Sequence, residues 1–139
     1  MVRIKQTFGS KLCCHKLEEE AIRAACPVDL TFENREFHLG DIEVIPTPGH
    51  TEGSACFMYK SPHGNTYLFT GDTIFPKNDS WRTYGSNEHQ RTLKESLELL
   101  GNLKPSVVIS SASVGPFSFK QVLPGEWQAI VNGAIRSLS

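Results

Sequence analysis

The feature that most constrains the fold is a pair of apolar segments joined by a short polar turn. The segments are residues 54–60 and 66–70, and the turn between them reads Ser61-Pro62-His63-Gly64-Asn65. Proline, glycine and asparagine favour a chain reversal, so the sequence predicts a β-hairpin here. The strand sequences ACFMY and YLFT are nearly continuous in apolar residues, which predicts that both faces of these strands are buried.

The rest of the chain alternates between strand-like and helix-like patterns. Further strands are expected at residues 11–15, 30–32, 37–39, 42–44 and 106–110. Helices are expected at residues 2–8, 16–25, 87–100 and from 124 onward, and residues 71–86 are expected to be irregular. This order predicts an α+β fold, with a mixed β-sheet and helices on one face, in a single domain of residues 1–139.

Composition excludes several classes of partner. The chain has 139 residues, of which 39% are hydrophobic, and its formal net charge is −1. No basic stripe favours nucleic acid or an anionic membrane surface, and no apolar run approaches the length of a membrane span. The four cysteines form no CxxC spacing, which is typical of reduced thiols. We therefore expect a cytoplasmic protein that binds neither nucleic acid nor membrane.

Two polar side chains stand at the ends of apolar strands, where sheet proteins often build sites. His50 follows residues 42–47, and Asp72 follows residues 66–71. Imidazole and carboxylate are suitable ligands for zinc or iron, and the two side chains could converge if their strands are neighbours. The alternative from residue chemistry alone is that each one only hydrogen-bonds to its own turn.

The sequence segments around these two residues resemble those of a known family. TPGHTEGS, followed about twenty residues later by LFTGDTIF, closely resembles the metallo-β-lactamase superfamily, especially its hydroxyacylglutathione-hydrolase-like members. The resemblance implies that His50 is the third histidine of a first metal site and that Asp72 is a carboxylate bridging two metals. It also implies that Thr51 and Gly53 shape the loop of residues 47–54 that carries His50, called the histidine loop below, with Thr73 following the aspartate. The implied fold is half of an αββα sandwich.

Two departures from the family pattern concern the metal ligands. The HxHxDH motif is absent, and the strand that normally leads to the last histidine continues as Ser110-Ser111-Ala112-Ser113. These serines also lack a GxSxG nucleophile pattern. Because a catalytic zinc usually has three protein ligands, the sequence predicts a truncated and degenerate domain without independent hydrolase activity. No cofactor is expected, and zinc or iron is the expected ion if a metal is bound.

Two other functions stay open. The chain could be a metal-dependent hydrolase of thioesters or lactones whose missing ligands come from another chain. It could instead bind a small molecule without metal, in a cleft lined by Thr51, Thr73, Trp81 and Arg82 beside His50 and Asp72.

A further expectation concerns association. A half-sandwich would leave one sheet face apolar and bare, so we expect a homodimer through that face. A charged residue at Phe57 or Leu68 should then break assembly and folding together.

Overall fold

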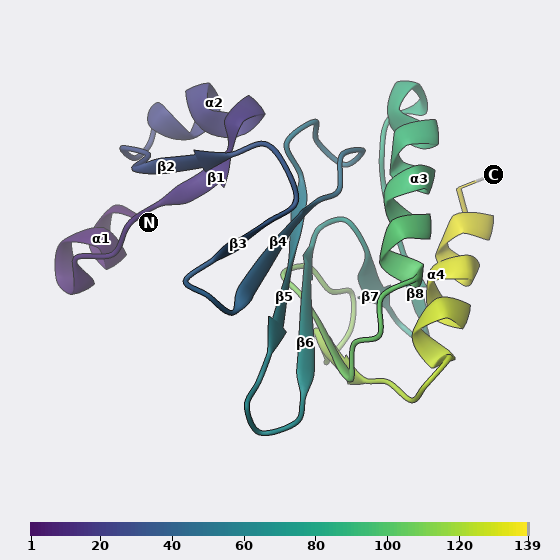
Figure 1. The fold of residues 1–139 in the computed structure, drawn as a ribbon. Coiled ribbons are helices and arrows are strands. Elements are labelled where there is room, and N and C mark those ends of the chain that lie inside the picture. The colour runs from purple at the N-terminus through teal and green to yellow at the C-terminus, as the bar shows by residue number, and fades with distance from the viewer. Residues whose placement is uncertain (139) are drawn as a thin grey trace.

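The centre of the protein is a six-stranded mixed sheet, seen in the computed structural model, which describes residues 1–138 (Figure 1). In spatial order its strands are β10 (Phe119–Gln121), β9 (Val107–Ser110), β6 (Thr66–Gly71), β5 (Ala55–Lys60), β4 (Ile42–Pro46) and β3 (Glu36–His38). Neighbouring strands are antiparallel except β6 and β9, which are parallel. The α+β class, the mixed sheet and the β5–β6 hairpin are therefore confirmed.

Two helices cover one face of this sheet. They are α3 (Gln90–Gly101) and α4 (Glu126–Arg136), which lie together on the same side of the strands (Figure 1). Leu93, Leu97 and Leu100 of α3 are fully buried against sheet residues such as Leu68. The Trp127 indole N–H donates to the carbonyl oxygen of Leu100 at 2.8 Å and joins the two helices. The main core lies in this layer.

The opposite face is partly covered by an N-terminal unit. This unit contains α1 (Val2–Phe8), β1 (Cys13–His15), η1 (Lys16–Glu18), α2 (Glu19–Arg23) and β2 (Leu30–Phe32), and β1 pairs with β2 in a separate parallel ladder. Figure 1 places it on the side of the sheet away from α3 and α4. The ring of Phe32, which is 4% exposed, packs edge-on against Phe57 with ring centroids 6.3 Å apart. The sheet face that was expected to be bare is therefore covered at one end.

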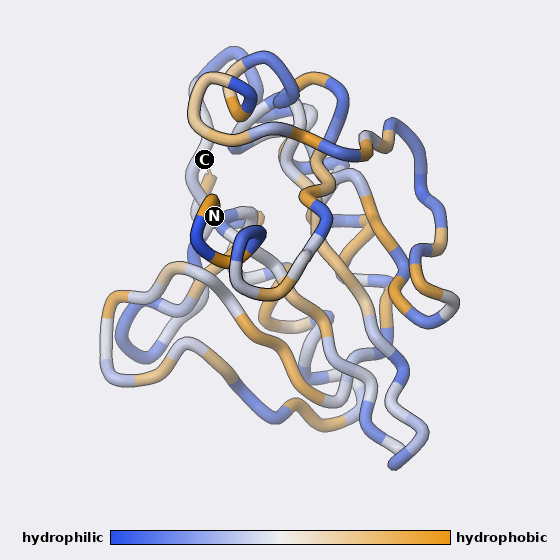
Figure 2. Tube along the Cα trace, turned by 90° about the vertical axis from the view of Figure 1, so that its left-hand side faces the viewer, coloured by the Kyte–Doolittle hydropathy of each residue, from blue (hydrophilic) through white to orange (hydrophobic). Residues whose placement is uncertain are grey.

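The hairpin strands are not buried equally on their two faces, contrary to the sequence-based expectation. Cys56, Met58 and Leu68 are buried on the helix side, whereas the next residue, Phe69, is 39% exposed. Phe69 is in register with Phe57 on one side and Ile109 on the other. Figure 2 shows apolar residues along the strands of the sheet, while the β5–β6 turn is hydrophilic. Apolar surface thus remains open towards β9 and β10.

Four local differences separate the observed elements from the expected ones. Residues 71–86 contain a second hairpin, formed by β7 (Phe75–Lys77) and β8 (Ser80–Arg82), and β10 was not expected either. The helix expected at residues 16–25 is reduced to η1 and α2. The helix expected from residue 87 begins with the short turn η2 (Asn87–His89). Within residues 1–138, the helices are all too short or too polar to span a bilayer.

Candidate functional site

His50 and Asp72 lie side by side at one edge of the sheet. Strands β4 and β6 both pair antiparallel with β5, so their carboxyl ends point to the same edge. His50 lies in the loop after β4, and Asp72 follows β6 directly. The distance between His50 Nε2 and Asp72 Oδ2 is 3.8 Å, too long for a direct hydrogen bond. The predicted proximity of the two side chains is confirmed, and their role as metal ligands stays a prediction.

The orientation of the imidazole is fixed by a backbone carbonyl. His50 Nδ1 lies 3.0 Å from the carbonyl oxygen of Tyr84. Since a carbonyl can only accept, Nδ1 carries a hydrogen, and Nε2 is the ring nitrogen that faces Asp72. Metal-binding histidines are commonly oriented in this way, with the second ring nitrogen donating to a carbonyl or carboxylate. The side chains of His50 and Asp72 are 30% and 52% exposed, so the pair is open to water.

The third side chain at this edge is a serine. Ser111, immediately after β9, donates its hydroxyl hydrogen to Asp72 Oδ1 at 2.8 Å. Ser110 donates in the same manner to the carbonyl oxygen of Gly71 at 2.8 Å and fixes the end of β6. Within residues 1–138, no three His, Cys, Asp or Glu side chains are grouped closely enough to hold a metal ion. The available donors are thus one imidazole, one carboxylate and one neutral hydroxyl.

The histidine loop is held in place from two sides. On one side Gly49 lies against α3, where a Cβ on this glycine would come within 2.5 Å of Leu93 Cβ. On the other side the backbone N–H of Gly53 donates to Glu18 Oε1 at 3.0 Å. Thr51 bonds to the hydroxyl of Ser54 through both its N–H and its side chain, each at 2.9 Å. Thr51 therefore stabilises the loop.

Thr73 does not line a cleft, which corrects the sequence-based expectation. It is 1% exposed, and its hydroxyl lies 3.1 Å from that of Thr47. The Thr47 hydroxyl also lies 3.4 Å from the sulfur of Cys56. Thr73 thus belongs to a buried polar group beneath the site, where its hydroxyl is satisfied by other side chains.

Cys56 in this buried group should be chemically inert in the folded protein. Burial raises the pKa of its thiol from 9.0 to about 11, against a smaller lowering by the Thr47 and Thr73 hydroxyls. Iodoacetamide at pH 8 should therefore leave Cys56 unmodified until the protein unfolds, as measured by peptide mass spectrometry, with half-buried Cys13 modified first. Because the folded-state pKa is raised, the contribution of this thiol to stability is complete below pH 9.0 and is lost as the pH rises towards 11. Modification of Cys56 in the native state at the rate of an unfolded thiol would contradict this.

Trp81 and Arg82 line a different cavity, and a single cleft that joins them to the His50–Asp72 pair stays a prediction. Both belong to β8 and line a cavity whose wall includes neither His50 nor Asp72. The Trp81 ring packs edge-on against Trp127 of α4, with centroids 5.9 Å apart.

Sequence reasoning missed two groups at the site itself. Tyr84 contributes a backbone carbonyl, which has no side-chain signal. From sequence, Ser111 is a replacement for a histidine and a nucleophile candidate, although its place after a strand could have suggested contact with Asp72.

Comparison with known proteins identifies the fold. The sequence profile of the Metallo-beta-lactamase superfamily matches residues 15–112. Similar solved structures include MIM-2 Metallo-Beta-Lactamase, with a TM-score of 0.71 and 12% identity, covering 98% of this chain and 61% of the other. The metallo-beta-lactamase GOB-18 from Elizabethkingia meningoseptica has a TM-score of 0.66 and 12% identity, covering 99% and 64%.

BJP-1, a subclass B3 metallo-beta-lactamase of Bradyrhizobium japonicum, has a TM-score of 0.66 and 15% identity, covering 98% and 64%. The chain thus spans about three-fifths of the length of these structures. No curated protein matches the chain.

Proposed function

The chain belongs to the metallo-beta-lactamase superfamily, and we propose that it is a member in which His50 and Asp72 form an incomplete metal site without hydrolase activity of its own. The observation that carries this proposal is the donor set at the sheet edge. One imidazole nitrogen and one carboxylate oxygen lie 3.8 Å apart, and the next side chain is the hydroxyl of Ser111.

The geometry of the pair fits two corners of a zinc coordination sphere. Two ligands about 2 Å from one tetrahedral zinc ion lie about 3.4 Å apart, close to the distance between His50 Nε2 and Asp72 Oδ2. His50, Asp72 and Ser111 together do not fit a catalytic zinc site, which usually has three protein ligands and a water. A neutral serine hydroxyl is a weak substitute for a third imidazole or carboxylate.

Metal analysis tests this proposal directly. We expect the protein, purified without chelator, to contain far less than one zinc or iron ion per chain by plasma emission spectroscopy. Titration calorimetry with zinc should detect only weak binding, which His50→Ala removes. The control is His63→Ala in the exposed β5–β6 turn, which removes an imidazole without touching the site. Near-equimolar metal that is lost in His50→Ala but kept in His63→Ala would overturn the proposal.

A second candidate function follows from the orientation of His50. An imidazole with Nδ1 anchored and Nε2 free towards a carboxylate is ready to bind a metal once further ligands arrive. A hydrolase of thioesters or lactones, of the hydroxyacylglutathione-hydrolase type, could be completed by another chain that supplies those ligands. A complex isolated from the native host, with bound zinc and thioesterase activity that both depend on His50, would favour this candidate over the first.

A further inference from the structure

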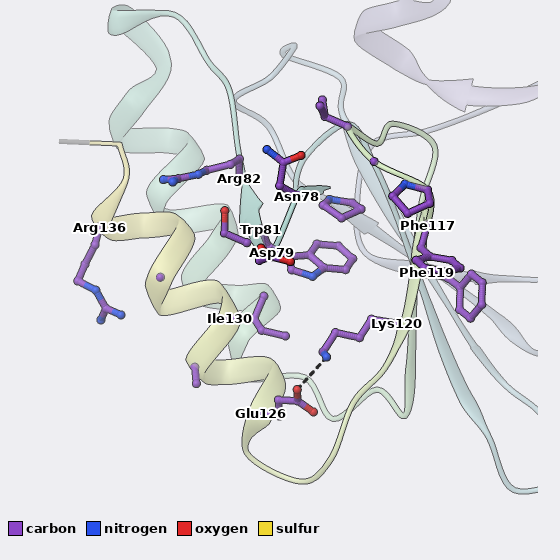
Figure 3. Close-up of a pocket in the computed structure, with 17 residues that line it drawn as sticks. Asn78, Asp79, Trp81, Arg82, Phe117, Phe119, Lys120, Glu126, Ile130 and Arg136 are labelled. Atoms are coloured by element: carbon purple, nitrogen blue, oxygen red, sulfur yellow. Dashed lines mark ion pairs between the residues drawn. The ribbon is translucent and has the colours of Figure 1, made fainter.

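A large cavity lies apart from the His50–Asp72 pair. It measures about 1320 Å³, opens to solvent and lies between the β7–β8 hairpin, the segment around residues 114–120 and helix α4 (Figure 3). Its wall contains no residue of the histidine loop and not Asp72. A ligand would therefore bind in this cavity whether or not His50 and Asp72 hold a metal ion.

The walls of the cavity are connected to one another by three separate contacts. Asn78 N–H donates to the Val114 carbonyl at 2.8 Å, which ties the hairpin to the neighbouring segment. Trp81 packs against Trp127 and holds the hairpin on α4. Lys120 of β10 forms an ion pair with Glu126 of α4 at 3.1 Å, drawn as a dashed line in Figure 3. The cavity is therefore formed before any ligand arrives, as is usual for binding sites of small molecules.

One part of the lining is apolar and has room for a flat ring. Trp81 contributes an indole, and Ile130 and Ala129 contribute aliphatic side chains from α4. Gly133 on the same helix adds open space, since a Cβ there would meet only the tip of Arg136, at 3.9 Å. An indole beside aliphatic groups favours an aromatic or other planar apolar body.

The charged part of the lining has an excess of cations. Arg82, Lys120 and Arg136 stand against Asp79 and Glu126, which gives one more positive than negative charge. Glu126 is already engaged, because the Leu123 N–H and Lys120 both bind its carboxylate and hold its pKa below the usual value. Within residues 1–138, Arg82 and Arg136 take part in no ion pair. Two guanidinium groups thus remain available for an anion, which arginine binds with paired hydrogen bonds.

From this combination we propose that the cavity binds a small organic anion that carries a planar apolar ring, such as an aryl carboxylate. The ring lies against Trp81 and Ile130. The carboxylate is bound by Arg82 of β8 or by Arg136 of α4, both of which line the cavity. In Figure 3 Arg82 extends from β8 towards α4, and Arg136 extends along the outer side of α4.

Titration with 2-naphthoate, followed by two-dimensional amide NMR, tests this proposal. We expect saturable shifts at the Trp81 indole and at backbone amides of residues 78–82 and of α4. The double variant Arg82→Gln/Arg136→Gln should bind roughly tenfold more weakly, because hydrogen bonds to charged groups are lost. Arg91→Gln is the control, since it removes one arginine charge from α3, where the side chain is 92% exposed. The neutral isostere 2-naphthamide should bind more weakly than 2-naphthoate.

Three results would overturn the proposal. The first is absence of saturable binding at millimolar 2-naphthoate. The second is equal affinity for 2-naphthamide or for the double arginine variant, which would show that the anion is not recognised. The third is a set of shifts centred on the open sheet face around Phe69 instead of Trp81. Thermal unfolding of each variant, monitored by circular dichroism, verifies that the fold is retained.

Discussion

Aspartate in place of Leu68 should unfold the protein, whereas aspartate in place of its neighbour Phe69 should leave it folded. Leu68 is fully buried in the core between the sheet and α3, and Phe69 on the opposite face is 39% exposed. An unpaired carboxylate at Leu68 would cost about 4 kcal/mol or more, a large part of the stability of an ordinary domain. At Phe69 the carboxylate stays in contact with water. Circular dichroism and urea unfolding of the two variants measure the difference.

The same pair of variants also tests the predicted homodimer. We expect the wild-type protein to sediment as a dimer at micromolar concentration and Phe69→Asp to sediment as a folded monomer, because Phe69 and Phe119 leave apolar surface open on that face. From sequence, loss of assembly and loss of folding are expected to occur together. The structure separates them, since Leu68 lies on the helix side of the sheet. A wild-type monomer would show that the homodimer prediction is wrong. Equal stability of Leu68→Asp and Phe69→Asp would contradict the assignment of the two faces.

Alanine in place of Gly49 should destabilise the protein strongly and displace the histidine loop. Gly49 has a φ of 139°, and its Cβ would come within 2.6 Å of the Cα of Leu93 in α3. Backbone strain and the clash with a core helix together should cost about 3 kcal/mol or more. The urea midpoint measures the loss of stability, and the NMR signals of the His50 ring measure the change in its environment.

Gly40→Ala is the control for this substitution. Gly40 also has a positive φ, 83°, but a Cβ there meets nothing within 4 Å. Its substitution should cost only the backbone strain, about 1 kcal/mol. If Gly49→Ala is no more destabilising than Gly40→Ala, the close packing of the histidine loop on α3 is not important for stability.

The sequence predicted those parts of the fold that have strong local signals. The β5–β6 hairpin followed from two apolar runs around a proline- and glycine-containing turn. The proximity of His50 and Asp72 was expected from the resemblance to the metallo-β-lactamase superfamily, and in the structure it arises because β4 and β6 flank the same strand, β5. The β7–β8 hairpin could not be predicted, since its strands have three residues each, one with a proline, and it is supported by a distant segment at Val114.

Burial was harder to predict than strand position. An apolar run such as YLFT has the same sequence whether both faces are covered or only one, so the exposure of Phe69 depends on which elements pack nearby. The orientation of His50 was also beyond prediction, since it depends on a carbonyl of Tyr84. Trp81 and Arg82 line a cavity whose wall includes neither His50 nor Asp72, and its position depends on the packing of Trp81 on Trp127, which has no local signal in the sequence.

The most direct test of the central claim is the rate of thiol release from a hydroxyacyl thioester in the presence of saturating zinc. The proposed incomplete site predicts that the wild-type protein hydrolyses the thioester no faster than zinc in buffer, and that His50→Ala and Asp72→Ala give the same rate. A zinc-dependent turnover that is present in the wild-type protein and lost in both variants would contradict the account.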